Sequence, residues 1–239
     1  MLKLSIISNY LSEDNVPNML IVIDGPAGAG KSSTAKAVAR KAGVDYIDSG
    51  ALYRGYTLLY VQIGCNKSKF FDLIDEDILT FEFTRDISKA YLRGKDVTEK
   101  LRDEVVNNNV STIASFPEVR KKVSVFLKDA ARTKDCIAEG RDLGTVVFPD
   151  AELKFFLTAD INERALRRQK ELSGELDLEQ VKENLISRDL QDSSRENDPL
   201  VKANDAIEID TTKTTFDEQV NLILAEIEKH AAQHNNNKP

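Results

Sequence analysis

The chain has 239 residues, is 41% hydrophobic and carries a formal net charge of −7. That is enough apolar material for one α/β domain with insertions, and the acidic balance argues against a general nucleic-acid-binding protein. No apolar run approaches the roughly 18 residues that a membrane span needs. Two cysteines, Cys65 and Cys136, form no CxxC motif, so the sequence predicts neither a disulfide framework nor a zinc site and fits a reducing cytoplasm.

The histidines exclude several kinds of chemistry. The chain has two of them, His230 and His234, and both stand close to its C-terminal end. Ser–His triads, Cys–His pairs and histidine–metal sites are therefore excluded from the body of the protein. Phosphoryl transfer remains compatible with the sequence, because it depends on positioning and on charge stabilisation by Lys, Arg and metal ions.

The first predicted strand leads into a phosphate-binding motif. Residues 1–18 show no periodicity and are interpreted as an N-terminal extension. Met19–Asp24 is an apolar run that predicts a buried strand, and Ser32–Ala42 has helical periodicity with Gly43 as its C-terminal stop. Between them stands the G-x-x-x-x-G-K-[ST] pattern of a P-loop: Gly25-Pro26-Ala27-Gly28-Ala29-Gly30-Lys31-Ser32.

The chemistry of this loop suits a nucleoside triphosphate. Its glycines let backbone N–H groups surround a phosphate, and the N-terminus of the following helix adds its positive dipole end. Lys31 would reach the β- and γ-phosphates, and the Ser32 hydroxyl would bind Mg²⁺. A glycine-rich turn that binds nothing is the alternative, and the strand–loop–helix context disfavours it.

Strands and helices alternate through the rest of the chain, which predicts an α/β fold with a five-stranded parallel sheet covered on both faces. After Met19–Asp24, strands are predicted at Val44–Asp48, Cys136–Glu139, Leu153–Thr158 and Ala206–Asp210. Helices are predicted at Ser32–Ala42, Ala51–Ile63, Pro117–Thr133, Ile161–Leu172, Leu178–Leu190 and Phe216–His230. The segments that follow the strands should meet at one edge of the sheet, where ligands bind in such folds.

Two stretches interrupt the alternation. Residues 67–109 are predicted to form a small β-containing insert, with strand-like runs at Leu79–Phe83, Ala90–Leu92 and Asp96–Thr98. Residues 164–195 are highly charged and are interpreted as a mobile excursion. Residues 19–66 and 110–232 then form the core, and 233–239 form a polar tail.

Arginines mark the predicted ligand edge. A single surface arginine is most often a solvated charge, and Arg164, Arg167 and Arg168 share one helix, so a basic face is the simpler alternative there. Arg141 differs, because it follows an apolar strand between Gly140 and Asp142. A guanidinium group there is suited to grip phosphate and to stabilise transition-state charge.

At this point the sequence resembles the bacterial cytidylate kinase family, from about Met19 to Ile227. The most specific string is Gly140-Arg141-Asp142-Leu143-Gly144-Thr145-Val146-Val147-Phe148-Pro149-Asp150. The resemblance also rests on the P-loop, on Asp48-Ser49-Gly50-Ala51-Leu52-Tyr53-Arg54, and on Arg188-Asp189 through Asp192 to Arg195. It implies a P-loop NTPase three-layer fold in which 67–109 is a monophosphate-binding insert and about 164–195 is a mobile lid.

The resemblance implies an enzyme that transfers the γ-phosphate of ATP to CMP or dCMP, with Mg²⁺. The P-loop and Ser33 would hold ATP, while Ser49, Arg54, Arg141 and Arg195, with Tyr53 beside them, match positions that hold the CMP phosphate. Ser111, Arg120 and Asp142 match positions that read cytosine, and Arg188 and Asp192 match ribose contacts. Arg164 and Arg168 are lid candidates for transition-state charge, beside Lys31, Arg141 and Arg195. Asp192 as a lid cap or ion pair, and Ser111 as an ordinary helix hydroxyl, remain open alternatives.

Two other functions remain open at this stage. One is another P-loop small-molecule kinase, acting on a different monophosphate or a small alcohol. The other is a nucleotide-dependent switch ATPase, although the nearest string to the N-K-x-D element of GTPases, Asn66-Lys67-Ser68-Lys69, lacks the aspartate. We expect a cytoplasmic monomer that binds ATP, CMP and dCMP and neither nucleic acid nor membranes. Asp24 and Glu139 are both candidates for the Mg²⁺ shell.

Overall fold

A computed structural model of the chain describes residues 19–172 and 176–236. The predicted N-terminal extension, residues 173–175 of the predicted lid and the last residues of the predicted tail lie outside the described residues. In the described part, no helix is both long and apolar enough to cross a membrane.

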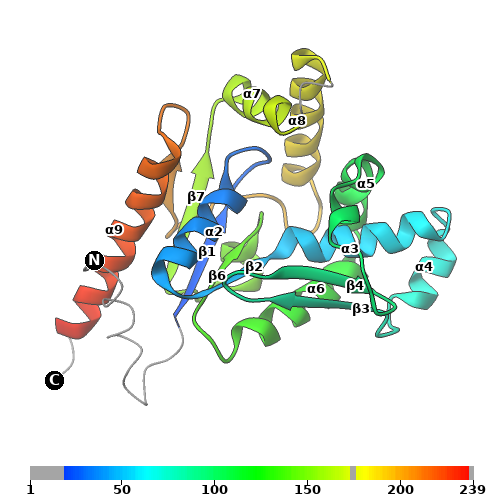
Figure 1. Cartoon of the computed structure of the whole chain (residues 1–239), viewed down its shortest axis with the longest axis horizontal. Helices are drawn as coiled ribbons and strands as arrows, with labels where there is room; N and C mark the ends of the chain where they lie inside the picture. The colour runs from blue at the N-terminus through cyan, green and yellow to red at the C-terminus, as the bar shows by residue number, and fades with distance from the viewer. Residues whose placement is uncertain (1–18, 173–175, 237–239) are drawn as a thin grey trace.

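A five-stranded sheet forms the centre of the fold (Figure 1). Its strands run in the order β2-β6-β1-β7-β8, and every pairing is parallel. Their bounds are Leu20–Asp24 (β1), Asp45–Asp48 (β2), Cys136–Glu139 (β6), Leu153–Thr158 (β7) and Ile207–Asp210 (β8). The predicted parallel sheet is confirmed, and because its strands end at one edge, the P-loop after β1 lies beside the residues that follow β6.

Helices cover both faces of the sheet, as the alternation along β1 requires. Ile21 and Ile23 pack on one face against α2 (Lys31–Ala42) and α9 (Phe216–Asn236). Val22 points to the other face, which α3 (Ser49–Gln62) and α6 (Pro117–Ala131) cover. The result is the predicted three-layer arrangement (Figure 1).

Helix α9 is longer than the sequence predicted. It begins behind a capping box, in which Thr215 and Glu218 each accept a hydrogen bond from the other's backbone N–H group. It then continues past His230, where the sequence predicted its end, to Asn236. Alanine and glutamine follow His230, and both residue types favour the helix interior.

The segment 67–109 contains the predicted small sheet together with unpredicted helices. Its antiparallel strands are β3 (Leu79–Phe83), β4 (Ser88–Leu92) and β5 (Lys95–Asp96). The strand predicted at Asp96–Thr98 instead spans Lys95–Asp96, so it begins one residue earlier and ends two residues earlier than expected. Lys95 already pairs with Leu92 across a two-residue turn. Helix α4 (Lys67–Leu73) precedes the sheet, and a 3-10 turn, Glu99–Arg102, and helix α5 (Glu104–Ala114) follow it.

The segment 164–195 forms most of a helix pair above the P-loop (Figure 1). Helices α7 (Ile161–Glu171) and α8 (Leu178–Ser193) share a small apolar core, in which Ala165, Val181 and Leu185 pack together with Ala27. The P-loop therefore contacts this helix pair directly.

The cysteines lie in different surroundings. Cys65 is exposed in the connection between α3 and α4, and Cys136 is buried in β6. Burial raises the pKa of the Cys136 thiol to about 12.

Candidate active site

The P-loop adopts a conformation that its glycines permit. A Cβ atom on Gly25 would lie 2.1 Å from the carbonyl oxygen of Leu157, so no side chain fits there. Gly30, immediately before α2, has a φ of 89° in the left-handed region that glycine favours. The loop thus brings unobstructed backbone and the N-terminus of α2 to the edge of the sheet, which is the geometry that binds phosphate.

Lys31 points back into the loop. Its Nζ donates a hydrogen bond to the carbonyl oxygen of Pro26 at 2.7 Å, and its side chain is buried. Burial and the nearby Arg141 lower the pKa of Lys31, although Glu139 and Asp24 oppose the shift. A bound phosphate would place negative charge beside Lys31 and so stabilise the charged form of its buried ammonium group.

Ser32 and Glu139 form an oxygen pair suited to Mg²⁺. The Ser32 hydroxyl donates to Glu139 Oε1 at 2.6 Å, and the Tyr46 hydroxyl donates to the same oxygen at 3.3 Å. Among the described residues, no group of three or more His, Cys, Asp or Glu side chains could hold a metal ion. A hydroxyl and one carboxylate fit the way in which Mg²⁺ binds at nucleotide sites, where phosphates and water supply the other ligands.

Asp24, the other carboxylate considered for Mg²⁺, is engaged elsewhere. Its two oxygens accept hydrogen bonds from the backbone N–H groups of Leu143 and Gly144, at 3.1 and 2.7 Å. Burial raises the pKa of Asp24 to about 7. Asp24 therefore fastens the turn after β6 to the end of β1, and Glu139 is the better placed of the two for a metal.

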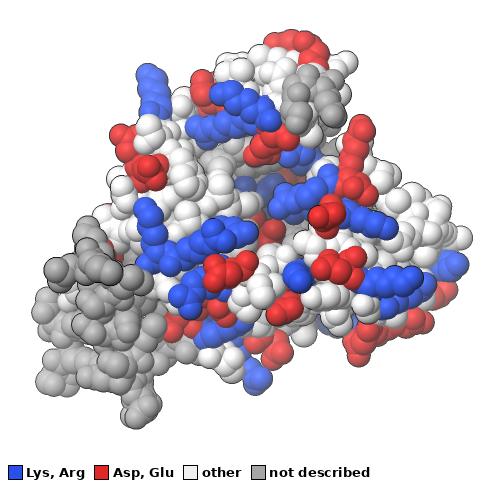
Figure 2. Space-filling model, viewed as in Figure 1, with Lys and Arg blue, Asp and Glu red and all other residues white. Residues whose placement is uncertain are grey.

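A cavity of about 720 Å³ opens above the P-loop. The side chains of eight cations and four carboxylates line it, which leaves it positive in a chain whose net charge is negative. Figure 2 shows Lys and Arg side chains gathered around this hollow. Burial, together with the nearby Arg141, Arg54 and Arg168, lowers the pKa of Arg188 to about 10. The cavity is therefore arranged for an anionic ligand.

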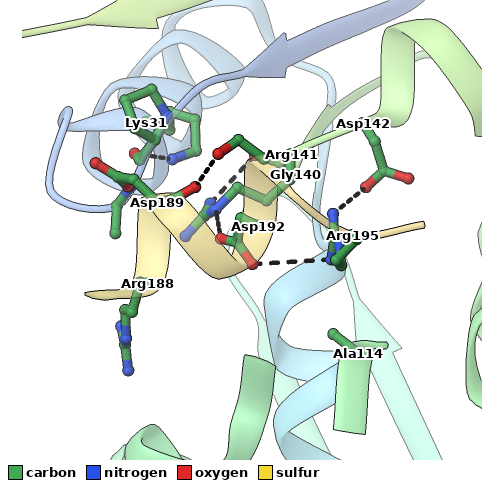
Figure 3. Close-up of polar contacts among 12 residues, drawn as sticks. Lys31, Ala114, Gly140, Arg141, Asp142, Arg188, Asp189, Asp192 and Arg195 are labelled. Carbon is green, nitrogen blue, oxygen red and sulfur yellow. Dashed lines mark hydrogen bonds and ion pairs between the residues drawn. The ribbon is translucent and has the colours of Figure 1, made fainter. Parts of the chain in front are cut away.

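Arg141 and Arg195 meet at the buried carboxylate of Asp192 (Figure 3). Arg141 Nε lies 3.0 Å from one carboxylate oxygen, and Arg195 Nη1 lies 3.8 Å from the other. Within the described residues, the buried Nε atoms of Arg54 and Arg195 have no hydrogen-bond partner. Buried donors without partners are costly, so these two atoms indicate a place for ligand oxygens.

A second buried ion pair closes the other end of the cavity. Arg120 Nη2 donates to Asp142 Oδ2, and Nη1 donates to the carbonyl oxygen of Ala114 at 3.2 Å. The guanidinium carbon of Arg120 lies 5.7 Å from the centre of the Tyr53 ring. Burial raises the pKa of Asp142, against the effect of Arg120 and Arg195. This end carries both an acidic and a basic hydrogen-bonding group, which suits the polar edge of a nucleobase.

The structure brings most of the predicted site residues into one cavity. The predicted residues that line it are Ala27, Gly28, Gly30, Lys31, Ser32, Ser33, Ser49, Tyr53, Arg54, Ser111, Arg141, Asp142, Arg168, Arg188, Asp192 and Arg195. Arg120 does not line the cavity, but it pairs with Asp142, which does. Gly25, Pro26 and Ala29 belong to the loop without lining the cavity, and Arg164 is buried beneath it.

Arg164 has a different setting from the one that the sequence suggested. Its Nη1 donates to the carbonyl oxygen of Ala27 at 3.0 Å and to Asp189 Oδ2. It therefore joins the P-loop to helix α8 and does not face the cavity.

Sequence reasoning missed several residues that line the cavity. Arg102 and Asn107 come from the segment 67–109, Arg167 comes from α7, and Glu139 was considered only for the metal. Arg188 Nη2 donates to the carbonyl oxygen of Asn107 at 2.5 Å, which joins α8 to α5. The motif strings gave no signal for these contacts, because each depends on how distant segments pack.

Fold and site together define a P-loop kinase, in which a phosphate-binding loop faces a second, arginine-lined anion site. Comparison with a solved gluconokinase from Sinorhizobium meliloti supports the fold alone: it is 14% identical, has a TM-score of 0.52, and the match covers 93% of this chain and 98% of that one. The sequence gives the particular family. The model of the cytidylate kinase family matches residues 21–229, and the chain belongs to this family.

Individual relatives agree with the family match. A cytidylate kinase from Pediococcus pentosaceus is 42% identical over 214 residues, which cover 87% of this chain and 95% of the relative. A cytidylate kinase from Cytophaga hutchinsonii is 41% identical over 214 residues, which cover 86% and 92%. The chain is therefore an enzyme of the nucleoside monophosphate kinase class.

Proposed function

We propose that this enzyme transfers the γ-phosphate of ATP to CMP or dCMP, giving ADP and the corresponding diphosphate, with Mg²⁺ bound beside Ser32. Action on CMP follows from membership of the cytidylate kinase family. The observation that carries the proposal is one cavity that extends from Lys31 in the P-loop, past Arg141, to Asp142 (Figure 3). Asp142 in turn pairs with the buried Arg120.

The P-loop end is the donor site. Backbone N–H groups at the start of α2 and Lys31 hold the ATP phosphates, while Ser32 and Glu139 provide oxygen atoms for Mg²⁺, which neutralises phosphate charge when bound. Arg168, on the wall that α7 contributes, provides positive charge near the transferring group.

The arginines around Asp192 form the acceptor-phosphate site. Arg141, Arg195 and Arg54 are suited to hold the CMP phosphate, because two of them carry buried donors without partners. Ser49 belongs to this group, although its hydroxyl now donates to the carbonyl oxygen of Glu139 at 2.7 Å. Arg188 and Asp192 remain the proposed ribose contacts.

The Arg120–Asp142 end reads the base. Cytosine presents an amino donor beside ring-nitrogen and carbonyl acceptors, which match a carboxylate beside a guanidinium group. Uracil presents a carbonyl where cytosine has its amine, and that oxygen would face Asp142 unfavourably. A buried polar site left unpaired by the wrong base loses affinity steeply. Ser111, on α5, lines the same cavity and is a proposed third contact.

The acceptor is already a phosphate anion, so the reaction needs no strong general base. Catalysis comes from aligning donor and acceptor, from the charges of Lys31 and the arginines, and from exclusion of water when the helix pair α7–α8 closes. We further propose that residues 67–109 act as the monophosphate-binding insert and about 164–195 as the lid.

One assay tests this function. The purified protein is mixed with ATP·Mg²⁺ and, separately, CMP, dCMP, UMP, AMP, GMP or no acceptor, and ADP and the diphosphate are quantified. We expect strong turnover with CMP and dCMP and weak turnover with UMP. A preference for another monophosphate would still support a kinase but would overturn the base-reading assignment. ADP formation at the same rate with and without an acceptor would support a switch ATPase.

The setting of the enzyme is also a proposal. We propose a cytoplasmic monomer with no nucleic-acid partner, which is compatible with two free thiols and a negative net charge. Light scattering coupled to size exclusion tests the monomer, and a larger mass would contradict it.

A further inference from the structure

Asp198 has an unusual backbone conformation close to the base-reading end. It lies in the segment after α8, with a φ of 52°, and it is not a glycine. It also precedes a proline, which restricts its backbone further. The segment is held in place, because the N–H of Leu200 donates to the carbonyl oxygen of Asp192 at 2.8 Å. Such strained residues persist where surrounding contacts require them, and they cluster at functional sites.

The strained conformation lets one residue contact two arginines. The Asp198 carboxylate accepts a hydrogen bond from Arg120 Nε at 2.5 Å. Its carbonyl oxygen accepts one from Arg195 Nη2 at 2.9 Å. Asp198 therefore joins the arginine at the base end of the cavity to an arginine of the acceptor-phosphate site.

These contacts fix the guanidinium group of Arg120 on three sides. A guanidinium group has five N–H donors. Asp198 takes the Nε donor, Ala114 takes one on Nη1 and Asp142 takes one on Nη2. Two donors, one on each Nη, take no part in these three contacts.

We propose that Asp198 is a positioning residue for base recognition: it orients Arg120 so that the two remaining Nη donors and Asp142 together match cytosine and reject uracil. This inference rests on the proposed function. Asp198 acts through Arg120 and need not touch the base.

The discrimination depends on that orientation. With its Nε edge anchored, Arg120 presents donors at fixed positions beside the Asp142 carboxylate, which accepts from the cytosine amine. Without Asp198, Arg120 keeps only its Nη contacts and can turn about them. Its donors can then bond the carbonyl oxygens of uracil almost as well as the acceptors of cytosine. The preference for CMP over UMP therefore becomes smaller.

The test compares two substitutions of Asp198 with a matched control. Asp198→Gly removes the carboxylate and still permits a positive φ. Asp198→Asn keeps an oxygen that accepts from Arg120 Nε, and asparagine tolerates the same backbone region. Glu196→Gln is the control, because Glu196 is an exposed acid two residues away in the same segment. KM and kcat are measured for CMP, UMP and ATP, with thermal unfolding as a check on folding.

We expect Asp198→Gly to raise the KM for CMP about tenfold and to lower the CMP-to-UMP ratio of kcat/KM by a similar factor, with the KM for ATP unchanged. Asp198→Asn should fall between Asp198→Gly and the unmodified enzyme, and Glu196→Gln should match the unmodified enzyme. An unchanged CMP-to-UMP ratio in Asp198→Gly would overturn the proposal, whether or not its melting temperature falls. Failure of the unmodified enzyme to prefer CMP would instead overturn the proposed base-reading site, so the two failures are distinguishable.

Discussion

The carboxylate of Asp189, on α8, accepts a hydrogen bond from the backbone N–H of Ala27 at 3.2 Å. Its second oxygen pairs with Arg164, and Arg164 donates to the carbonyl oxygen of Ala27. Both polar backbone groups of one P-loop residue are thus held by side chains of the helix pair. Movement of α8 is thereby coupled directly to the loop that binds ATP.

This coupling predicts the effect of Asp189→Ala. The substitution removes both carboxylate contacts and leaves Arg164 attached only to backbone carbonyls, so the helix pair should be held less firmly over the loop. We expect the KM for ATP to rise about tenfold, and the share of ADP formed without acceptor to increase. Steady-state assays with and without CMP measure both quantities. Glu183→Ala, an exposed acid on the same helix, is the control, and an unchanged KM for ATP in Asp189→Ala would contradict the coupling.

Lys31→Ala should lower turnover by about a hundredfold or more, because the buried ammonium lies within the P-loop that is proposed to hold the triphosphate. Lys41→Ala, an exposed lysine at the end of the same helix, should leave turnover unchanged. Rapid-quench measurement of a single turnover separates the chemical step from product release. A folded Lys31→Ala protein with a near-normal rate would remove Lys31 from the mechanism.

Arg141 is expected to be as important on the acceptor side. Arg141→Ala deletes a cation that pairs with Asp192 and should lower turnover by about a hundredfold or more. Arg141→Lys keeps the positive charge but loses the planar, forked arrangement of guanidinium donors. Its turnover should therefore lie between that of Arg141→Ala and that of the unmodified enzyme. Turnover is compared with that of Arg40→Ala, a surface arginine paired with Asp86. Equal rates in Arg141→Lys and the unmodified enzyme would show that the fork geometry is unimportant.

Ser32 gives a prediction about the metal. Ser32→Ala removes the hydroxyl that lies 2.6 Å from Glu139 and should raise the Mg²⁺ concentration needed for half-maximal rate by about tenfold. Ser32→Thr keeps a hydroxyl and should need little more Mg²⁺ than the unmodified enzyme. Titration of turnover with Mg²⁺ at fixed ATP measures the change, and an identical requirement in Ser32→Ala would place the ion elsewhere.

Asp24 predicts how stability depends on pH. Burial raises its pKa from 3.8 in a free carboxyl group to about 7 in the folded chain. Between these values the folded state binds more protons than the unfolded state, so the contribution of Asp24 to the free energy of unfolding falls as pH rises. The slope approaches about 1.4 kcal/mol per pH unit inside that window.

Asp24→Asn isolates this contribution, because the amide does not titrate but still accepts a hydrogen bond. Urea unfolding across the window should give a shallower decline with pH for Asp24→Asn than for the unmodified enzyme. Parallel declines would mean that Asp24 keeps an ordinary pKa in the folded chain.

Local sequence patterns were sufficient to predict the strands of the parallel sheet, but they did not predict the helices of the segment 67–109. Cys136–Glu139 and Leu153–Thr158 are bounded apolar runs, and both strands have the predicted bounds. Helix α5 was missed because Asn107, Asn108 and Asn109 occupy its middle, and asparagine is a poor helix former. Tertiary packing against α3 and α6 overrides that preference.

The site likewise contains parts that the sequence predicts and parts that it does not. The P-loop could be predicted because its strand, loop and helix follow one another in the chain. The pairing of Arg120 with Asp198 joins residues separated by 78 positions, and no local pattern encodes it. Family resemblance identified Arg120 and Asp142, yet the contacts that orient them become visible only when the segment after α8 is folded beside α6.

The unequal cysteines make the unmodified chain suitable for site-specific labelling. Cys65 is exposed in the connection between α3 and α4, whereas the buried Cys136 thiol would be both shielded and protonated in the folded state. A maleimide dye should therefore attach at Cys65 alone. That position lies between α3 and the segment 67–109, so the dye would test whether this segment, the proposed monophosphate-binding insert, moves relative to α3 when CMP binds.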